Sequence, residues 1–316
     1  MFVGPVTKGR SGHIWFRALI RASVVLSSAL LGIGCTADVA VVATPVSAEL
    51  FDVEQLERAE EAGAGRVILI PPGGDDRLGI LRPSVGARTS LLILPDVSEE
   101  TVASVGGGRH LFFDVGPHGG GGDETAEFGA VAEEADKDRI VLDRRGGFRR
   151  AGELVAAYVE NRLESEPTTA DTITVRLFLL QGSEERLEEG KAMLEPIREL
   201  LPSDRILLEE VNPGFGVQAI EQRIGEARQS DPLLLLLGAP GMEPALRSVG
   251  QAGPVVTESL FLPLGGIPAE TAEPGTLYLV GVDPTELIIA ARQGRDGAIE
   301  AAVHGYPEGL EGIVPR

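Results

Sequence analysis

The feature that most constrains the fold is an alternation of short apolar runs with helix-type segments, from residue 38 to about residue 303. The runs are rich in β-branched residues or leucine and are bounded by Pro or Gly, as is typical of buried strands. They span residues 38–44, 66–70, 90–94, 111–114, 140–143, 172–180, 205–211, 233–237, 276–283 and 299–303. Helical patterns lie between them over residues 47–62, 148–163, 184–201, 217–229 and 284–293. This alternation predicts parallel sheets with helices on both faces.

So many strands are unusual in one open sheet, and the alternation is interrupted over residues 144–150. The sequence therefore predicts an α/β fold of two doubly wound parallel-sheet lobes. The expected division is a signal segment over residues 1–34, an N-terminal α/β lobe over 35–143, a C-terminal α/β lobe over 144–303 and a short return segment over 304–316. Open α/β sheets bind ligands beyond the carboxyl ends of their strands. Two such edges that face each other would enclose a ligand cleft.

The N-terminal segment has the order of an export signal. Lys8, Arg10, Arg17 and Arg21 precede an apolar run over residues 22–34, and the segment contains no acid. The run is too short to cross a hydrocarbon core of about 30 Å as a helix, but it suits a signal peptide. The small residues that end it precede Cys35, the single cysteine.

The segment Leu31-Gly-Ile-Gly-Cys35 resembles the cleavage box of bacterial lipoproteins. The resemblance implies that Cys35 is lipidated, becomes the mature N-terminus and anchors the protein to a membrane. The alternative is an ordinary secretory signal with an incidental cysteine. Either reading predicts an exported protein, periplasmic or at the cell surface.

The charge balance bears on the choice of partner. The formal net charge is −20, and the basic signal segment makes the remainder more acidic still. Such a surface repels phosphate backbones, so we do not expect nucleic-acid binding. Hydrophobic residues make up 43 % of the chain but aromatics only 4 %, which predicts a core of mostly aliphatic side chains.

Three predicted strands end in an acid that is followed by a turn: Asp114, Asp143 and Asp283. An acid in this position lies at the rim where ligands bind and can accept two hydrogen bonds from sugar hydroxyls or pair with an amine. Asp is equally common as a turn former or a helix cap. The sequence leaves both roles open.

Other motifs are weak. Gly214-Phe215-Gly216-Val-Gln-Ala219 is a relaxed dinucleotide fingerprint, but no acid follows at the distance that a ribose contact needs. The four histidines are scattered, and there is no nucleophile with a neighbouring base. The sequence therefore predicts no enzyme, no cofactor and no metal site.

Over residues 38–305 the chain resembles the type I periplasmic solute-binding proteins, the ribose- and galactose-type binding proteins with the sensor domains of lactose-repressor-like regulators. The similar segments are residues 91–102, 111–114, 140–143 with 151–159, 184–190 and 280–303. The resemblance implies hinge closure around a ligand. The residues expected at the ligand are Asp114, Asp143, Arg186 and Asp283 as polar contacts, with Phe51 and Phe215 as apolar walls.

The predicted function is an exported, lipid-anchored solute-binding protein that captures a small polar, sugar-like ligand for an ABC-type uptake system or a sensor. Two departures from the family pattern favour an alternative. Val115 stands where the family has an arginine, and Gly238-Ala-Pro240 stands where it has a polar Asn-Asp pair. The alternative is an envelope interaction or structural lipoprotein on the same fold with a degenerate cleft.

Overall fold

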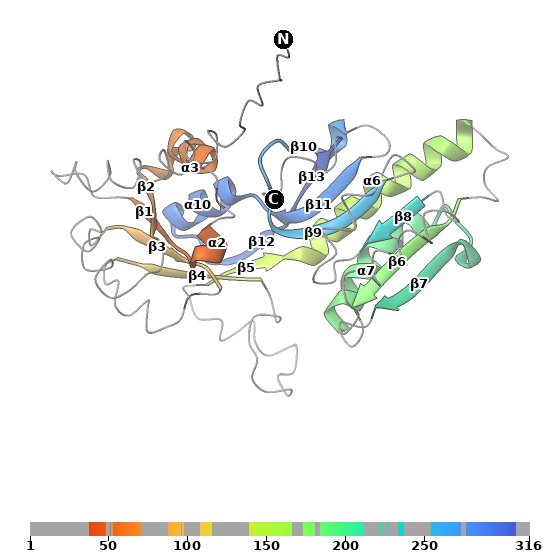
Figure 1. The fold of residues 1–316 in the computed structure, drawn as a ribbon, viewed down its shortest axis with the longest axis horizontal. Coiled ribbons are helices and arrows are strands. Elements are labelled where there is room, and N and C mark those ends of the chain that lie inside the picture. The colour runs from red at the N-terminus through yellow and green to blue at the C-terminus, as the bar shows by residue number, and fades with distance from the viewer. Residues whose placement is uncertain are drawn as a thin grey trace, which may run out of the picture.

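The strands in the part of the chain that the structure describes form a six-stranded, a four-stranded and a three-stranded sheet (Figure 1). The computed structural model describes residues 38–48, 51, 53–70, 88–95, 97, 108–115, 139–165, 173–180, 184–211, 222, 226, 233–236, 254–272 and 276–307. Within these residues no helix is long and apolar enough to span a membrane.

The six-stranded sheet is parallel throughout and belongs to the first lobe. Its strands are β1 (Val39–Val42), β2 (Val67–Ile70), β3 (Ser90–Ile93), β4 (His110–Asp114), β5 (Arg139–Asp143) and β12 (Gly297–Glu300). They lie in the order β12-β5-β4-β3-β1-β2. Reading from β2, the order is second, first, third, fourth and fifth along the chain, which is a doubly wound arrangement. All four residues of β1 are buried, as expected for a central strand covered on both faces.

One face of this sheet is covered by α3 (Val53–Ala59) and α10 (Pro284–Gln293), which lie against each other. Alternate strand residues point toward them, among them Val41, Leu92 and Phe113. The opposite alternation, with Val42 and Leu91, forms a separate buried cluster on the other face. The helix predicted over residues 47–62 is divided in the structure: α2 (Pro45–Ala48) precedes α3, and a π-helical segment, η1 (Glu60–Ala64), follows it.

The second lobe repeats the same strand order. The three-stranded parallel sheet contains β6 (Val175–Leu180), β7 (Ile206–Val211) and β8 (Leu233–Leu236), in the order β7-β6-β8. β8 lies beside β9 (Val255–Phe261), which pairs in parallel with β11 (Leu277–Val282). The strands of the second lobe thus lie in the order β7-β6-β8-β9-β11. This is the second, first, third, fourth and fifth strand of the lobe along the chain, if the two-residue β10 (Ile267–Pro268) is not counted. β13 (Ala302–Tyr306) is antiparallel to both β11 and β10.

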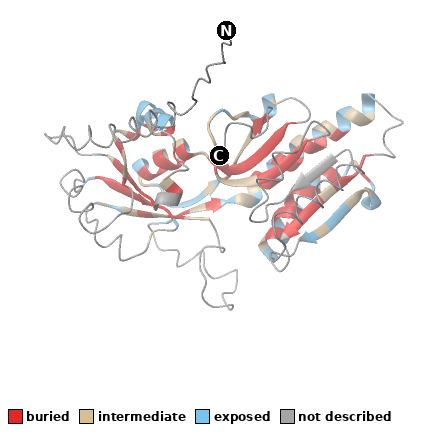
Figure 2. Cartoon of the chain, viewed as in Figure 1, coloured by how far each residue is buried: buried red, intermediate tan, exposed pale blue. Residues whose placement is uncertain are grey.

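Among the described residues, two helices cover the second lobe. α6 (Arg144–Ser165) packs against α7 (Glu184–Arg198) and also contacts β11, while α7 contacts β6. In both helices the face toward the neighbouring elements is buried and the opposite face is exposed (Figure 2). The helices cross closely at Gly152, where a Cβ would lie 2.1 Å from the carbonyl oxygen of Met193. No other residue fits that position without a shift of backbone.

The described chain passes between the lobes after β5, after β11 and after β12. The first and third passages lie side by side, because the Ala301 N–H donates to the Asp143 carbonyl at 2.9 Å. They also pack closely at Gly147, whose added Cβ would lie 2.7 Å from the Ala301 side chain and 2.8 Å from that of Val280. The prediction of two doubly wound α/β lobes is confirmed, and the first and third passages between them are tightly packed against each other.

One strand assignment was wrong. The sequence predicts a single strand over residues 299–303 in the second lobe, but the chain changes lobes within that segment. β12 pairs with β5 of the first sheet, and after Ala301 β13 joins the second-lobe sheet. Because both halves are short and adjacent in the chain, composition could not show that they belong to different sheets. The helix α10 likewise packs on the first sheet. The residue limits of the lobes themselves stay a prediction.

Candidate functional site

The carboxyl ends of the strands of both lobes are the first place to look for a site, since open α/β sheets bind ligands there. Two of the predicted acids, Asp143 and Asp283, lie at the passages between the lobes, at the ends of β5 and β11. The described residues at these edges hold two distinct groups: a buried cluster of charges in the second lobe, and a cluster of aromatic rings that joins the lobes.

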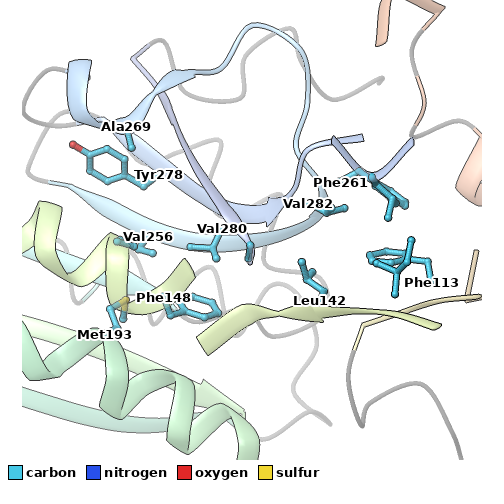
Figure 3. Packing of buried hydrophobic residues seen from close by; sticks show 14 of the residues in the cluster. Phe113, Leu142, Phe148, Met193, Val256, Phe261, Ala269, Tyr278, Val280 and Val282 are labelled. Carbon is cyan, nitrogen blue, oxygen red and sulfur yellow. The ribbon is translucent and has the colours of Figure 1, made fainter. Parts of the chain in front are cut away.

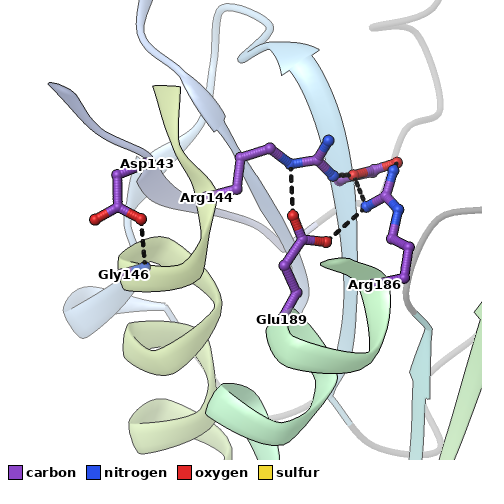
Figure 4. A network of polar contacts seen from close by, with 6 residues as sticks. Asp143, Arg144, Gly146, Arg186 and Glu189 are labelled. Atoms are coloured by element: carbon purple, nitrogen blue, oxygen red, sulfur yellow. Dashed lines mark hydrogen bonds and ion pairs between the residues drawn. The ribbon is translucent and has the colours of Figure 1, made fainter. Parts of the chain in front are cut away.

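Asp143 and Asp283 both bind backbone amides of the helices that they precede. The Asp143 carboxylate accepts a hydrogen bond from the Gly146 N–H at 3.2 Å, at the start of α6 (Figure 4). The Asp283 carboxylate accepts from the Thr285 N–H at 2.8 Å and is the N-cap of α10. The structure therefore gives each acid a role at a helix start, which the sequence left open. Their predicted contact with a ligand stays a prediction.

Asp114 ends β4 and lies beside β5 of the same sheet. Its carboxylate is 3.5 Å from the Arg139 guanidinium, and about a third of its side chain is exposed (32 %). The neighbouring β5 supplies the partner because Asp114 is opposite Val141, two residues beyond Arg139. Asp114 is thus a partly exposed acid at the strand end, where the sequence placed it, and its contact with a ligand also stays a prediction.

Four charged side chains form a cluster at the start of α6, which we call the charged quartet: Arg144, Arg186, Glu189 and Glu258. Arg144 begins α6, Arg186 and Glu189 lie one turn apart on α7, and Glu258 lies on β9. Arg144 Nε is 3.3 Å from Glu189 Oε1, and Arg186 Nη1 is 2.9 Å from Glu189 Oε2 (Figure 4). Both guanidiniums also contact the Glu258 carboxylate. The positive and negative groups alternate, and the quartet has no net charge.

The quartet is withdrawn from solvent. The exposed fraction of the side chain is 7 % for Arg186, 9 % for Glu189 and 12 % for Arg144. Burial, followed by repulsion from Arg186, lowers the pKa of Arg144 to about 10. Burial also lowers the pKa of Arg186, against the raising effect of Glu189. The Cζ atom of Arg144 lies 5.9 Å from the centroid of the Phe148 ring, within the range of a cation–π contact.

Such a cluster can exchange partners as well as hold them. Guanidiniums bind carboxylates and polyols through a planar fork of N–H donors, and they do so most strongly where water is excluded. Among the described residues, no group of three His, Cys, Asp or Glu side chains could hold a metal ion. The polar contacts of the quartet are hydrogen bonds and ion pairs among its own four side chains.

Aromatic rings join the two lobes in what we call the aromatic seam: Phe51, Phe113 and Phe261. Phe51 and Phe113 belong to the first lobe, and Phe261 ends β9 of the second. The ring of Phe261 lies 4.8 Å from that of Phe51 and 6.0 Å from that of Phe113, in tilted contacts. Figure 3 shows the apolar packing that continues from this seam through Leu142 to Phe148. The cores of the lobes are therefore continuous.

A buried hydrogen bond adjoins the seam, from the Gln55 side-chain amide to the Leu262 carbonyl at 3.0 Å. Phe51, predicted as an apolar wall, is only 7 % exposed and packs on Phe261. Its predicted contact with a ligand stays a prediction. Phe215, the glycine-rich turn beside it and Cys35 lie outside the described residues.

The structure brings Arg186 together with three residues that the sequence analysis did not single out: Arg144, Glu189 and Glu258. Glu258 and Phe261 lie on β9, a strand that the sequence analysis missed. Its run Val255-Val-Thr-Glu-Ser-Leu-Phe261 has β-branched residues at its start, which was the available signal. Arg144 directly follows the strand-end acid Asp143, so its place at the edge could have been read from the same pattern.

Comparison with known proteins gives a likeness of fold. No protein-family model matches the chain, and no curated protein matches it by sequence. Solved structures do match, among them a glucose-galactose binding protein, GanP, from Geobacillus stearothermophilus, with 12 % identity and a TM-score of 0.40 over 86 % of this chain and 98 % of that one.

Two further matches have similar values. An ABC transporter, LacI-family transcriptional regulator from Brachyspira murdochii has 15 % identity and a TM-score of 0.47, covering 86 % of this chain and 94 % of that one. A carbohydrate transporter solute binding protein from Agrobacterium radiobacter, in complex with D-arabinose, has 12 % identity and a TM-score of 0.45, covering 87 % and 95 %. The topology of the described chain is type I periplasmic-binding-like. It consists of two doubly wound lobes, and the chain passes between them three times.

Proposed function

We propose that this chain is an exported, lipid-anchored protein that binds a small polar ligand at the carboxyl-end edges of its two lobes. The observation that carries the proposal is the charged quartet, which lies at the start of α6, directly after the passage from the first lobe to the second. A sugar-like solute is the class that the sequence resemblance implies. Lipidation of Cys35 and delivery to an ABC-type permease or a sensor complete the proposal.

The energetics of the quartet support a role beyond stability. Burying four charges costs desolvation free energy, and their mutual attraction offsets little more than that cost. Proteins in which apolar residues replace a buried ion pair are often as stable as the originals. The strands and helices around the quartet already have an extensive apolar core, with Phe148, Met193 and Val256 fully buried beside it. A charged group that stability does not require, placed at the edge where such sheets bind ligands, is best explained by recognition.

The test is a ligand screen with a matched pair of variants. Sugars, polyols, nucleosides and amino acids are tested by thermal shift, since a ligand at about 100 times its Kd adds about 2.7 kcal/mol of stability. Arg186→Met should abolish the shift from any hit. Arg150→Met, which removes an exposed arginine paired with Glu153 and Glu270, should leave it unchanged. A wide screen without a hit would contradict the proposal.

A second candidate is an envelope interaction or structural lipoprotein with a degenerate cleft. The aromatic seam favours it, because Phe51 packs on Phe261 of the other lobe and Gln55 binds the Leu262 carbonyl. Contacts of this kind hold the lobes together without a ligand. The two candidates differ in hydrogen exchange: a binding protein should gain protection at α6 and α7 when ligand is added, whereas the protection of a structural protein should not change with any compound of the screen.

A further inference from the structure

Glu258 is held by both arginines of the quartet. Arg186 donates from Nη1 to one oxygen of its carboxylate and from Nη2 to the other, which is the fork geometry of a strong arginine–carboxylate pair. Arg144 contacts one of the same two oxygens through Nη2. The two guanidiniums, one from α6 and one from α7, therefore converge on one carboxylate, which the strand β9 supplies.

The two glutamates of the quartet are not equivalent. Glu189 lies one turn from Arg186 on α7, so the helix itself fixes that pair, and its side chain is 9 % exposed. Glu258 reaches the arginines from β9 and is 22 % exposed, the largest value in the quartet. Glu258 is thus the most exposed member of the quartet, and no helix fixes it beside the arginines.

The charge balance requires a carboxylate at that place. With Glu258 withdrawn, the two buried guanidiniums would contact a single carboxylate, that of Glu189, with Glu185 as one further negative charge nearby. Repulsion from Arg186 already contributes to the lowered pKa of Arg144, so an excess positive charge here would be costly. Another anion of the same shape would restore the balance.

We propose that the paired guanidiniums of Arg144 and Arg186 form a carboxylate-binding site, that Glu258 occupies it when no ligand is bound, and that the ligand carries a carboxylate of its own. This inference rests on the proposed function and narrows its ligand class from polar solutes to carboxylated ones, such as sugar acids. The ligand carboxylate takes the fork of Arg186 and the Nη2 of Arg144, and the Glu258 side chain turns to solvent. No covalent step is involved.

The experiment compares wild type with Glu258→Ala and Glu258→Gln in the full-length protein. Removing the internal carboxylate should let acetate bind, so acetate should raise the Tm of Glu258→Ala by several degrees above chloride at equal ionic strength. Wild type should show no such difference. Glu270→Gln, which removes the charge of an exposed glutamate paired with Arg150, is the matched control and should behave as wild type.

A second measurement uses a sugar acid and its neutral counterpart. Wild type should bind D-galacturonate at least about ten-fold more tightly than D-galactose, and Glu258→Gln should widen the ratio because the internal competitor has lost its charge. If Glu258→Ala does not fold, this comparison decides alone. Equal affinity for the two sugars, or tighter binding of the neutral one, overturns the carboxylate site but leaves the proposed function standing. Failure of both sugars and of the wider screen counts against the proposed function itself.

Discussion

The charged quartet and the aromatic seam both use residues of β9, yet they achieve cohesion by opposite means. The seam brings the Phe261 ring against Phe51 and Phe113, and its free energy comes from apolar area removed from water. The quartet joins α6, α7 and β9 through alternating charges, which must recover a desolvation cost before they stabilise anything. Glu258 and Phe261 lie three residues apart on β9, yet the Phe261 contacts stabilise the fold directly and the Glu258 contacts do so only after their desolvation cost is met.

This difference separates a contact that holds the fold from a contact that can select a ligand. Apolar burial is not directional and tolerates any well-fitting neighbour, whereas a guanidinium fork accepts only an anion or a polar group of suitable geometry. We therefore expect loss of the seam to be measured as lost stability. The effect of a substitution in the quartet on the free energy of unfolding should depend on whether the charges that remain are balanced.

The largest expected effect is that of Phe261→Ala. The ring is 4 % exposed and contacts both other rings of the seam, so its removal should cost about 4 kcal/mol, from lost burial and the cavity that remains. Chemical denaturation measures the change. Leu208→Ala, at an exposed position on β7, is the control and should shift stability by under about 0.5 kcal/mol. A loss of under about 1 kcal/mol for Phe261→Ala would show that the lobes do not depend on the seam.

Glu189→Ala should have the next largest effect. It leaves the buried guanidiniums of Arg144 and Arg186 with only Glu258 between them, and an uncompensated buried charge costs about 3 kcal/mol. The measurement is again the free energy of unfolding. Glu153→Ala removes a glutamate from an exposed pair with Arg150 and should be nearly neutral. Equal effects of the two substitutions would mean that water reaches the quartet and screens it.

Much of the fold could be predicted from the sequence because its signals are local. The runs that became β1, β3 and β11 are continuous, apolar and bounded by Pro or Gly, and all three are buried strands. The last passage of the chain, from the first lobe back to the second after β12, was not visible. Residues 297–306 hold two short strands on either side of Ala301, and only the pairing of each strand shows which sheet it joins.

The candidate site was less predictable, because its members come from separate elements. Arg186 was identified through the family resemblance, but its partners lie 42 residues before it, three after it and 72 after it along the chain. Nothing in a single sequence shows which arginine a distant glutamate will meet. Asp283 illustrates the converse, since its cap is a local feature and was one of the two roles that the sequence left open.

Asp283→Ala should have a smaller effect than either change above. Loss of the carboxylate that accepts from the Thr285 N–H removes the N-cap of α10, which costs about 1 kcal/mol. Asp143→Ala should cost less, because that acid is exposed and its contact with the Gly146 N–H is longer, at 3.2 Å. Unfolding free energy and ligand affinity are measured on both variants. Lowered stability with unchanged affinity would assign Asp283 to the helix alone and contradict its predicted contact with the ligand.

The smallest expected effect on stability, and the sharpest test of the comparison, is that of the double variant Arg186→Met with Glu258→Met. Each single change leaves an unbalanced charge and should destabilise the protein, whereas the double change removes one positive and one negative group together. The remaining Arg144–Glu189 pair, at 3.3 Å, stays balanced, and methionine fills the vacated space with a flexible apolar chain. The double variant should therefore unfold within about 1 kcal/mol of wild type, although it should lose ligand binding completely. If the double variant loses as much unfolding free energy as the two single variants together, the quartet stabilises the fold as the seam does. That outcome would contradict a role of its charges in binding a ligand.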